Sequence, residues 1–237
     1  LNLEHGQGGK MMFPFADREY SFLEFFQDKK ILFWLSGNPC NNQVEKMIKR
    51  EFLCFWWVKY LYLSNDFIPF SKKFKILSPR HITGSRDTRG AMYKRKKNTN
   101  KIMFSDQENK QGMKFLKELG FIEGEKFICL IARDSDYKKK INPNVDWSYH
   151  DYRDADIKNY KLAAKNLADK GYWVLRMGKY TKKEFRCNHP KIIDYACSPE
   201  RSDFLDIWLT ANCYFFITNG TGLDSVADKF EKPLVCV

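Results

Sequence analysis

One segment of the chain, residues 146–153, brings carboxylates, a histidine and aromatic rings together within a few positions. Its residues read Asp-Trp-Ser-Tyr-His-Asp-Tyr-Arg. A general base must accept a proton from an attacking hydroxyl group, and Asp151 or His150 could do so. Alternatively, Asp151 caps the following helix and the aromatic side chains fasten the loop to the domain. The neighbouring side chains that could pack against a sugar or a nucleobase, or shape the loop, are those of Trp147, Tyr149, Tyr152 and Arg153.

This segment ends a long connection that starts at Asp134, after an apolar strand pattern, and finishes where a helical pattern begins. Compact domains rarely keep a structureless loop longer than about 12–15 residues unless it is functional or disordered. Disordered segments contain few large aromatic residues, whereas this one contains Trp147, Tyr149 and Tyr152. The connection is therefore predicted to form part of a binding site.

Basic side chains follow two of the apolar strand patterns, and the first of these is the one that precedes the long connection. Arg133 comes after the first and Arg176 after the second. In a parallel sheet covered by helices on both faces, ligands bind at the carboxyl ends of the strands. Arg133 could make a bidentate contact with a diphosphate and stabilise the charge on a leaving nucleotide. The alternative for Arg133 is an ion pair with Asp134 or Asp136, and the role of Arg176 stays equally open.

A Thr-Asn-Gly-Thr-Gly turn at residues 218–222 leads straight into a helical pattern. Backbone N–H groups, two threonine hydroxyls and the helix dipole could together bind an anion there, with phosphate as the natural guest. The chain has neither a Walker A lysine motif nor GxGxxG, which argues against a P-loop NTPase or an ordinary dinucleotide site. Alternatively, the glycines serve only a tight turn. The candidate donor-binding residues of the turn are Thr218, Asn219, Gly220, Thr221 and Gly222.

The 7 cysteines are scattered without a CxxC pair, and several lie in apolar runs. This pattern is typical of reduced, buried thiols in a cytosolic protein. The tightest polar group, at residues 187–189, lacks a second ligand pair at zinc spacing, so we predict no metal site. No secretion signal is recognisable, and the longest apolar run, residues 52–63, is too short and too interrupted to cross a bilayer.

The positive charge is concentrated in one segment. The chain has a formal net charge of +12, and residues 72–101 alone hold 11 basic side chains and one acidic one. The segment could be a solvated connection, or a patch for phosphate, an anionic membrane surface or nucleic acid. Nucleic acid is the least favoured partner, because residues 86–101 lack the repeated interleaving of aromatic and basic residues that base stacking requires.

The elements that must position these residues alternate regularly in the second half. Near-continuous apolar strands separated by helices predict a parallel sheet covered on both faces, so this half is Rossmann-like. Ser105 and Glu108 have capping-box spacing at the start of one helix. The expected strands are 30–35, 127–131, 172–175, 192–195, 213–217 and 233–237. The expected helices are 41–63, 106–119, 154–170, 202–211 and 223–230.

Several short segments of the second half are more distinctive than the elements around them. They are residues 133–135, 146–153, 176–178, 190–196, 201–204 and 221–222. Together they resemble a little-characterised family of proposed bacterial glycosyltransferases, over a span from about residue 28 to the end. More distantly, residues 202–237 are similar in layout to the nucleotide-sugar domain of heptosyltransferases. Asn219 departs from that pattern, in which we expect serine or threonine.

The resemblance implies an α/β fold of the GT-B-like class, with two Rossmann-like domains and parallel sheets. We expect the chain to be a fragment truncated at both ends. Residues 1–121 would be an incomplete N-terminal, acceptor-side domain, and residues 122–237 the C-terminal nucleotide-sugar domain.

The implied activity is metal-independent transfer of a sugar from a nucleotide-diphosphate donor to a glycan or lipid-linked acceptor, in cell-surface polysaccharide biosynthesis. The nucleotide sugar is a substrate, and no cofactor is expected. Arg133, Thr218 and the Thr221–Gly222 turn fit the role of stabilising the leaving diphosphate. We expect a cytoplasmic protein, with peripheral attachment to the inner membrane left open.

Overall fold

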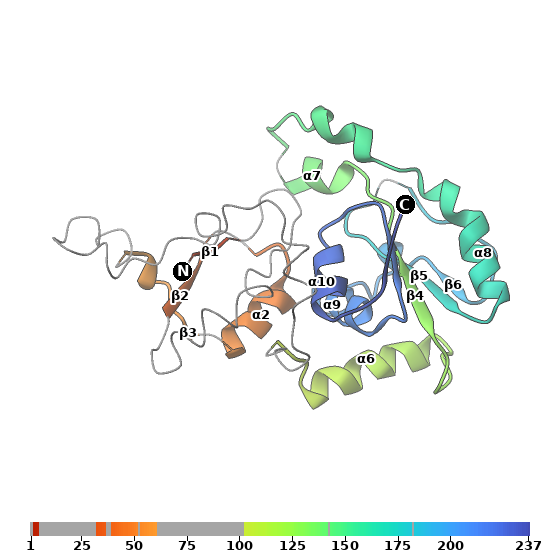
Figure 1. Ribbon diagram of the computed structural model, residues 1–237, viewed down its shortest axis with the longest axis horizontal. Helices are drawn as coiled ribbons and strands as arrows, with labels where there is room; N and C mark the ends of the chain where they lie inside the picture. Colours follow the sequence, from red (N-terminus) through yellow and green to blue (C-terminus); the bar gives the residue numbers. More distant parts are fainter. Residues whose placement is uncertain are drawn as a thin grey trace. The chain divides into compact units, whose positions relative to one another are not determined.

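The computed structural model divides into two compact units (Figure 1). The described residues up to Met103 belong to unit 1, and those from Phe104 to Val237 belong to unit 2. The sequence-based boundary at residue 121 places the helix that follows Ser105 in the N-terminal domain, whereas this helix packs within unit 2. The structure describes residues 2–4 and 32–36 as backbone only, and residues 39–51, 53–60, 102–141, 143–181 and 183–237 in full.

In its described residues, unit 1 contains a small parallel sheet and the helix α2. The sheet has the order β1-β2-β3, and both pairings are parallel. The Asn41 side chain begins the helix by accepting from the N–H groups of Gln43 and Val44, at 2.9 and 3.1 Å. The elements are β1 (Asn2–Glu4), β2 (Leu32–Ser36), α2 (Asn42–Glu51) and β3 (Leu53–Cys54).

The predicted long helix over residues 41–63 is wrong at residues 53–57, and residues 61–63 lie outside the described residues. The chain leaves α2 after Glu51, and Leu53 and Cys54 pair with β2. A continuous apolar and aromatic run has no polar face to define a helical period, so pairing with a neighbouring strand decides its structure. None of the helices in the described residues is long and apolar enough to cross a bilayer. The basic segment at residues 72–101 lies outside the described residues.

Unit 2 is built on a five-stranded sheet in which every pairing is parallel. This confirms the α/β class and the predicted parallel sheet. The strand order is β6-β5-β4-β7-β8. From the central strand β4 the chain adds β5 and then β6 on one side. It then returns to the other side of β4 and adds β7 and β8 there. The strands are β4 (Phe127–Leu130), β5 (Trp173–Arg176), β6 (Ile192–Ile193), β7 (Phe216–Thr218) and β8 (Leu234–Cys236).

The predicted helices of unit 2 begin close to their expected positions, with one exception. Three further short helices form where no helix was predicted: two inside the connection that was expected to be a loop, residues 134–153, and one at residues 195–197. The capping box between Ser105 and Glu108 is present, and Ser202 caps a later helix as expected. The helix expected from residue 154 starts as a 3-10 turn, capped by the Asp156 side chain, and becomes α-helical only at Lys161. The helices are α6 (Asp106–Glu118), α7 (Asp136–Ile141), η3 (Ser148–Arg153), η4 (Ile157–Tyr160), α8 (Lys161–Asp169), η5 (Tyr195–Cys197), α9 (Asp203–Asn212) and α10 (Asp224–Lys229).

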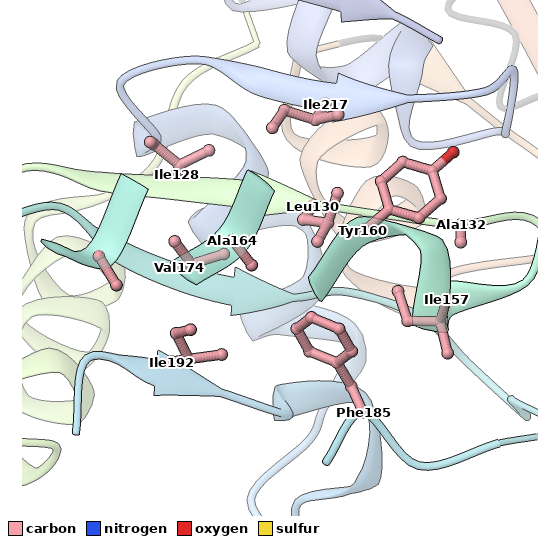
Figure 2. Close-up of a cluster of buried hydrophobic side chains, with 11 residues drawn as sticks. Ile128, Leu130, Ala132, Ile157, Tyr160, Ala164, Val174, Phe185, Ile192 and Ile217 are labelled. Carbon is pink, nitrogen blue, oxygen red and sulfur yellow. The ribbon is translucent and has the colours of Figure 1, made fainter. Parts of the chain in front are cut away.

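One face of the sheet packs against η4 and α8. Side chains from four neighbouring strands meet those of the two helices in a single apolar layer (Figure 2). Burial of each large aliphatic side chain contributes about 1.5–3 kcal/mol, so this layer fixes the strands relative to one another. Its strand residues are Ile128, Leu130, Val174, Ile192 and Ile217, and its helical residues are Ile157, Tyr160, Ala164 and Ala168.

On the other side of unit 2, α6 packs against α9. The contact is close because α6 has a glycine there, at Gly112. A Cβ atom at this position would lie 2.1 Å from Cδ2 of Trp208 on α9. The indole Nε1 of Trp208 also donates to Asn109 Oδ1 at 3.1 Å. These contacts attach α6 to unit 2.

Candidate functional site

The strand order of unit 2 reverses between β4 and β7, and the carboxyl ends of these two strands lie side by side. The Ile131 N–H donates to the Ile217 carbonyl at 2.9 Å, which keeps the chain paired just past β4. Such a reversal leaves a crevice at the carboxyl edge of the sheet, because the two following segments leave in opposite directions. Arg133 and the turn at residues 218–222 both lie at this edge.

Four basic side chains converge at this edge: Arg133, Lys138 on α7, and His150 and Arg153 on η3. We call them the basic cluster. Burial and the charge of Arg153 lower the pKa of Arg133. The pKa of Lys138 is lowered by burial, by Arg133 and by Arg153. The pKa of His150 is lowered by burial and then by Lys138, Arg133 and Arg153. Each of these three groups is therefore held where its protonated form is disfavoured.

Carboxylates offset only part of this charge. Arg133 Nε lies 3.8 Å from Asp154 Oδ1, too far for a hydrogen bond, and the Arg133 side chain is only 10% exposed. This pair differs from the sequence alternatives, which were Asp134 and Asp136. Burial raises the pKa of Asp154, as expected for a carboxyl group with weak compensation.

Two nitrogen atoms of the basic cluster, Arg133 Nη1 and His150 Nδ1, are buried without a hydrogen-bond partner in the described part of the chain. A buried polar atom without a partner costs about 1–3 kcal/mol, so native proteins contain few of them. The usual explanation is a ligand, an ion or a water molecule. The basic cluster therefore has the properties of an anion-binding site.

The turn at residues 218–222 directs its donors inward, toward a single carboxylate. The Thr218 hydroxyl donates to Asp224 Oδ1 at 2.6 Å, and the Thr221 hydroxyl donates to the same oxygen at 3.0 Å. The Thr221 N–H donates to Asp224 Oδ2 at 2.8 Å. Both hydroxyls that the sequence suggested for phosphate are thus engaged within the chain. The basic cluster offers more unsatisfied positive charge than this turn.

The Asn219 side chain joins the backbone at Arg133 to the backbone at Arg153. Its Oδ1 accepts from the Arg133 N–H at 2.8 Å, and its Nδ2 donates to the Arg153 carbonyl at 2.9 Å. The Arg153 guanidinium in turn donates through Nη2 to the Gly220 carbonyl at 3.3 Å. The turn therefore contacts both segments that carry the basic cluster.

The aromatic residues of 146–153 surround His150. Trp147 stacks on the imidazole with ring centroids 6.2 Å apart, and Tyr149 lies at 4.1 Å. Lys138 Nζ lies 4.5 Å from the Trp147 ring centroid. Tyr149 and Tyr152 are 61% and 83% exposed, so neither ring plugs the loop onto the domain. Their exposed faces border the basic cluster and are available to a ligand.

Asp151 is exposed on η3. The carboxylate that caps the next turn belongs to Asp156, so the alternative role of Asp151 as a helix cap is wrong. Its position on the same short helix as His150 and Arg153 leaves it beside the basic cluster.

Arg176 lies apart from these residues. Its side chain is 1% exposed and pairs with Asp194 at 3.0 Å, and it donates to the Thr181 hydroxyl at 3.0 Å. These contacts connect the end of β5 to the segment after β6. We therefore assign Arg176 to the architecture of the sheet edge and leave it out of the candidate site.

Sequence reasoning missed three residues of this region: Lys138, Asp154 and Asp224. Lys138 stands in a run of lysines, and nothing in the run distinguishes the one that faces Arg133 and His150. Asp154 could not be chosen among the acidic residues near Arg133. Asp224 had a detectable signal, because it follows Thr221 by the spacing of a capping box.

In the described residues, no group of three His, Cys, Asp or Glu side chains is placed to hold a metal ion. No protein-family model matches the chain, and no curated protein matches it significantly.

Proposed function

We propose that the protein is a glycosyltransferase whose basic cluster binds the diphosphate of a nucleotide-sugar donor. The observation that carries the proposal is the group of Arg133, Lys138, His150 and Arg153 at the crevice between β4 and β7, where Arg133 Nη1 is buried without a partner. A diphosphate supplies the negative charge and the acceptor oxygens that these groups lack.

The positive charge of the basic cluster suits the transfer of a sugar from a diphosphate. In the proposed reaction an acceptor hydroxyl attacks the anomeric carbon of the sugar, and the bond from that carbon to the diphosphate oxygen breaks. Negative charge then grows on the leaving diphosphate, and Arg133, Lys138 and Arg153 stabilise it in a partly buried site. This role needs no divalent metal. In the proposed reaction Asp151, an exposed carboxylate next to the basic cluster, takes the proton from the acceptor hydroxyl.

The acceptor in this proposal is a glycan or a lipid-linked glycan. The fold in this proposal is of the GT-B type. Two features support it: unit 2 has a parallel sheet with its crevice at the carboxyl edge, and unit 1 contains a parallel sheet with a β-to-α-to-β connection. The exposed rings of Tyr149 and Tyr152 supply faces on which a sugar can pack.

Donor binding tests the proposal. Calorimetric titration of the protein with UDP, GDP, CMP and TDP should reveal one preferred nucleotide. Arg133→Ala should abolish or strongly weaken that binding. Arg186→Ala is a matched control, because its side chain is 85% exposed and its removal changes the net charge equally. Binding of none of these nucleotides to the wild-type protein would sink the proposal.

A further inference from the structure

We propose that Asn219 is a positioning residue, which fixes the separation of Arg133 and Arg153 so that both guanidinium groups can contact one anion. The inference rests on the proposed function only in taking the basic cluster as an anion site. In this inference Asn219 does not contact the donor. It positions the two arginines that bind the donor.

The geometry uses both ends of the carboxamide. The oxygen accepts from the backbone of Arg133 at 2.8 Å, and the nitrogen donates to the backbone of Arg153 at 2.9 Å. An amide side chain offers an acceptor and a donor on one rigid plane. A carboxylate offers only acceptors, and a serine hydroxyl is too short to span the same two groups. Asparagine is thus the residue type that suits this bridge.

The hydrogen bonds of Asn219 act against the electrostatic repulsion between Arg133 and Arg153. Arg153 lowers the pKa of Arg133, so the two charges disfavour each other's presence. The repulsion pushes apart the two backbone segments that carry these side chains, and hydrogen bonds between the segments resist it. The Asn219 bridge supplies that restraint through neutral hydrogen bonds, which leave the positive charge of the cluster intact.

The base of the bridge is itself rigid. Asp224 accepts three hydrogen bonds from Thr218 and Thr221, which fixes the turn from which Asn219 projects. Gly220 has φ +92°, and a Cβ atom there would lie 3.1 Å from Arg153 Nη2. The positive φ favours glycine at this position, and a side chain there would push the arginine aside by a few tenths of an ångström.

Pyrophosphate titration tests the inference. Inorganic pyrophosphate should bind the wild-type protein, and Asn219→Ala should weaken its binding roughly tenfold or more, as expected for losing two hydrogen bonds and the preorganisation they give. Asn219→Ser, which can keep at most one of the bonds, should fall between the two. Glu125→Gln, at the opposite edge of the sheet, controls for a general loss of stability and should leave the dissociation constant unchanged.

A double-mutant cycle separates positioning from direct contact. If Asn219 acts through the arginines, Asn219→Ala should cost clearly less in an Arg153→Ala background than in the wild-type protein. Equal pyrophosphate affinity of wild type and Asn219→Ala overturns the positioning role and leaves the proposed function standing. Full additivity with Arg153→Ala also overturns it. A wild-type protein that binds neither pyrophosphate nor a nucleotide overturns both.

Discussion

The two edges of the sheet in unit 2 treat charge in opposite ways. At the amino edge, the Glu125 carboxylate accepts from the Ile122 N–H, from Trp173 Nε1 and from Lys191 Nζ, at 2.8, 2.7 and 2.7 Å. These bonds lower the pKa of Glu125 to about 2. At the carboxyl edge, the basic cluster has lowered pKa values and buried nitrogen atoms without partners.

The difference indicates which edge serves stability and which serves binding. Hydrogen bonds within the protein already stabilise the charged form of the Glu125 carboxylate, so a ligand would gain no binding energy from it. Charged groups whose pKa values are shifted against their charge cluster at functional sites, because a ligand later supplies the missing compensation. The amino edge of the sheet therefore serves as a reference against which the candidate site at the carboxyl edge can be compared.

The largest effect is expected from Arg133→Ala. Once the donor is known, the change should cost about 2–4 kcal/mol of transition-state stabilisation, because the leaving diphosphate loses a buried donor. This corresponds to a loss in kcat/KM of roughly 30-fold to almost a thousandfold. The melting temperature should stay the same or rise, since a poorly compensated charge is removed. A large fall in melting temperature with unchanged activity would reverse the assignment of the two edges.

His150 should make anion binding depend on pH. Its folded-state pKa lies below the ordinary 6.5, because burial and the cluster disfavour the imidazolium. A bound anion reverses this, so binding should take up a proton and tighten as pH falls from about 7.5 toward 6, by up to roughly tenfold per pH unit. Calorimetry with pyrophosphate in buffers of different ionisation enthalpy measures the proton uptake. His150→Gln should show a weaker dependence, because only the protonation of pyrophosphate itself remains, and an unchanged pH profile in that variant would exclude His150.

The same pKa shift has a consequence for stability without ligand. The unfolded chain binds a proton at His150 more readily than the folded protein does. The contribution of His150 to stability is therefore fully present above the ordinary pKa and is lost as pH falls through the lowered folded-state value. Chemical denaturation at pH 7.5 and pH 5, with His150→Gln as the comparison, isolates this contribution.

Asp224→Asn distinguishes the basic cluster from the neighbouring turn. The substitution leaves the turn with fewer acceptors and should cost about 1 kcal/mol of folding free energy for each hydrogen bond lost. Pyrophosphate affinity should fall modestly, because the base of Asn219 loosens. If the turn were itself the phosphate site, removing its internal carboxylate would strengthen binding instead. The sign of the change in the dissociation constant therefore decides between the two locations.

The sequence predicted the features of unit 2 that depend on local chemistry. Ser105 and Glu108 form the capping box because a helix start needs partners for its free N–H groups. Arg133 was located correctly at a strand end, since apolar runs mark the strands of a parallel sheet.

What the sequence could not predict depends on partners distant along the chain. The pairing of Arg133 with Asp154, and the bridge from Asn219 to Arg153, follow from how the loops meet at the sheet edge. Arg176 has the same sequence context as Arg133, but β6 brings Asp194 within 3.0 Å of Arg176, whereas Asp154 lies 3.8 Å from Arg133. The short strand at Leu53 was missed because tertiary pairing overrode the apparent helical run.

The smallest effect, and the sharpest check on the comparison, is expected from Glu125→Gln. The folded-state pKa of Glu125 is lowered from 4.5 to about 2, so its contribution to stability is present above pH 4.5 and is lost as pH falls toward 2. The variant should melt a few degrees lower at pH 7, and the difference should disappear near pH 2. Pyrophosphate binding should not change, because the substitution lies at the amino edge. A variant that melts normally but loses the anion would show that the two edges are coupled, and that charge compensation does not separate stability from function in this sheet.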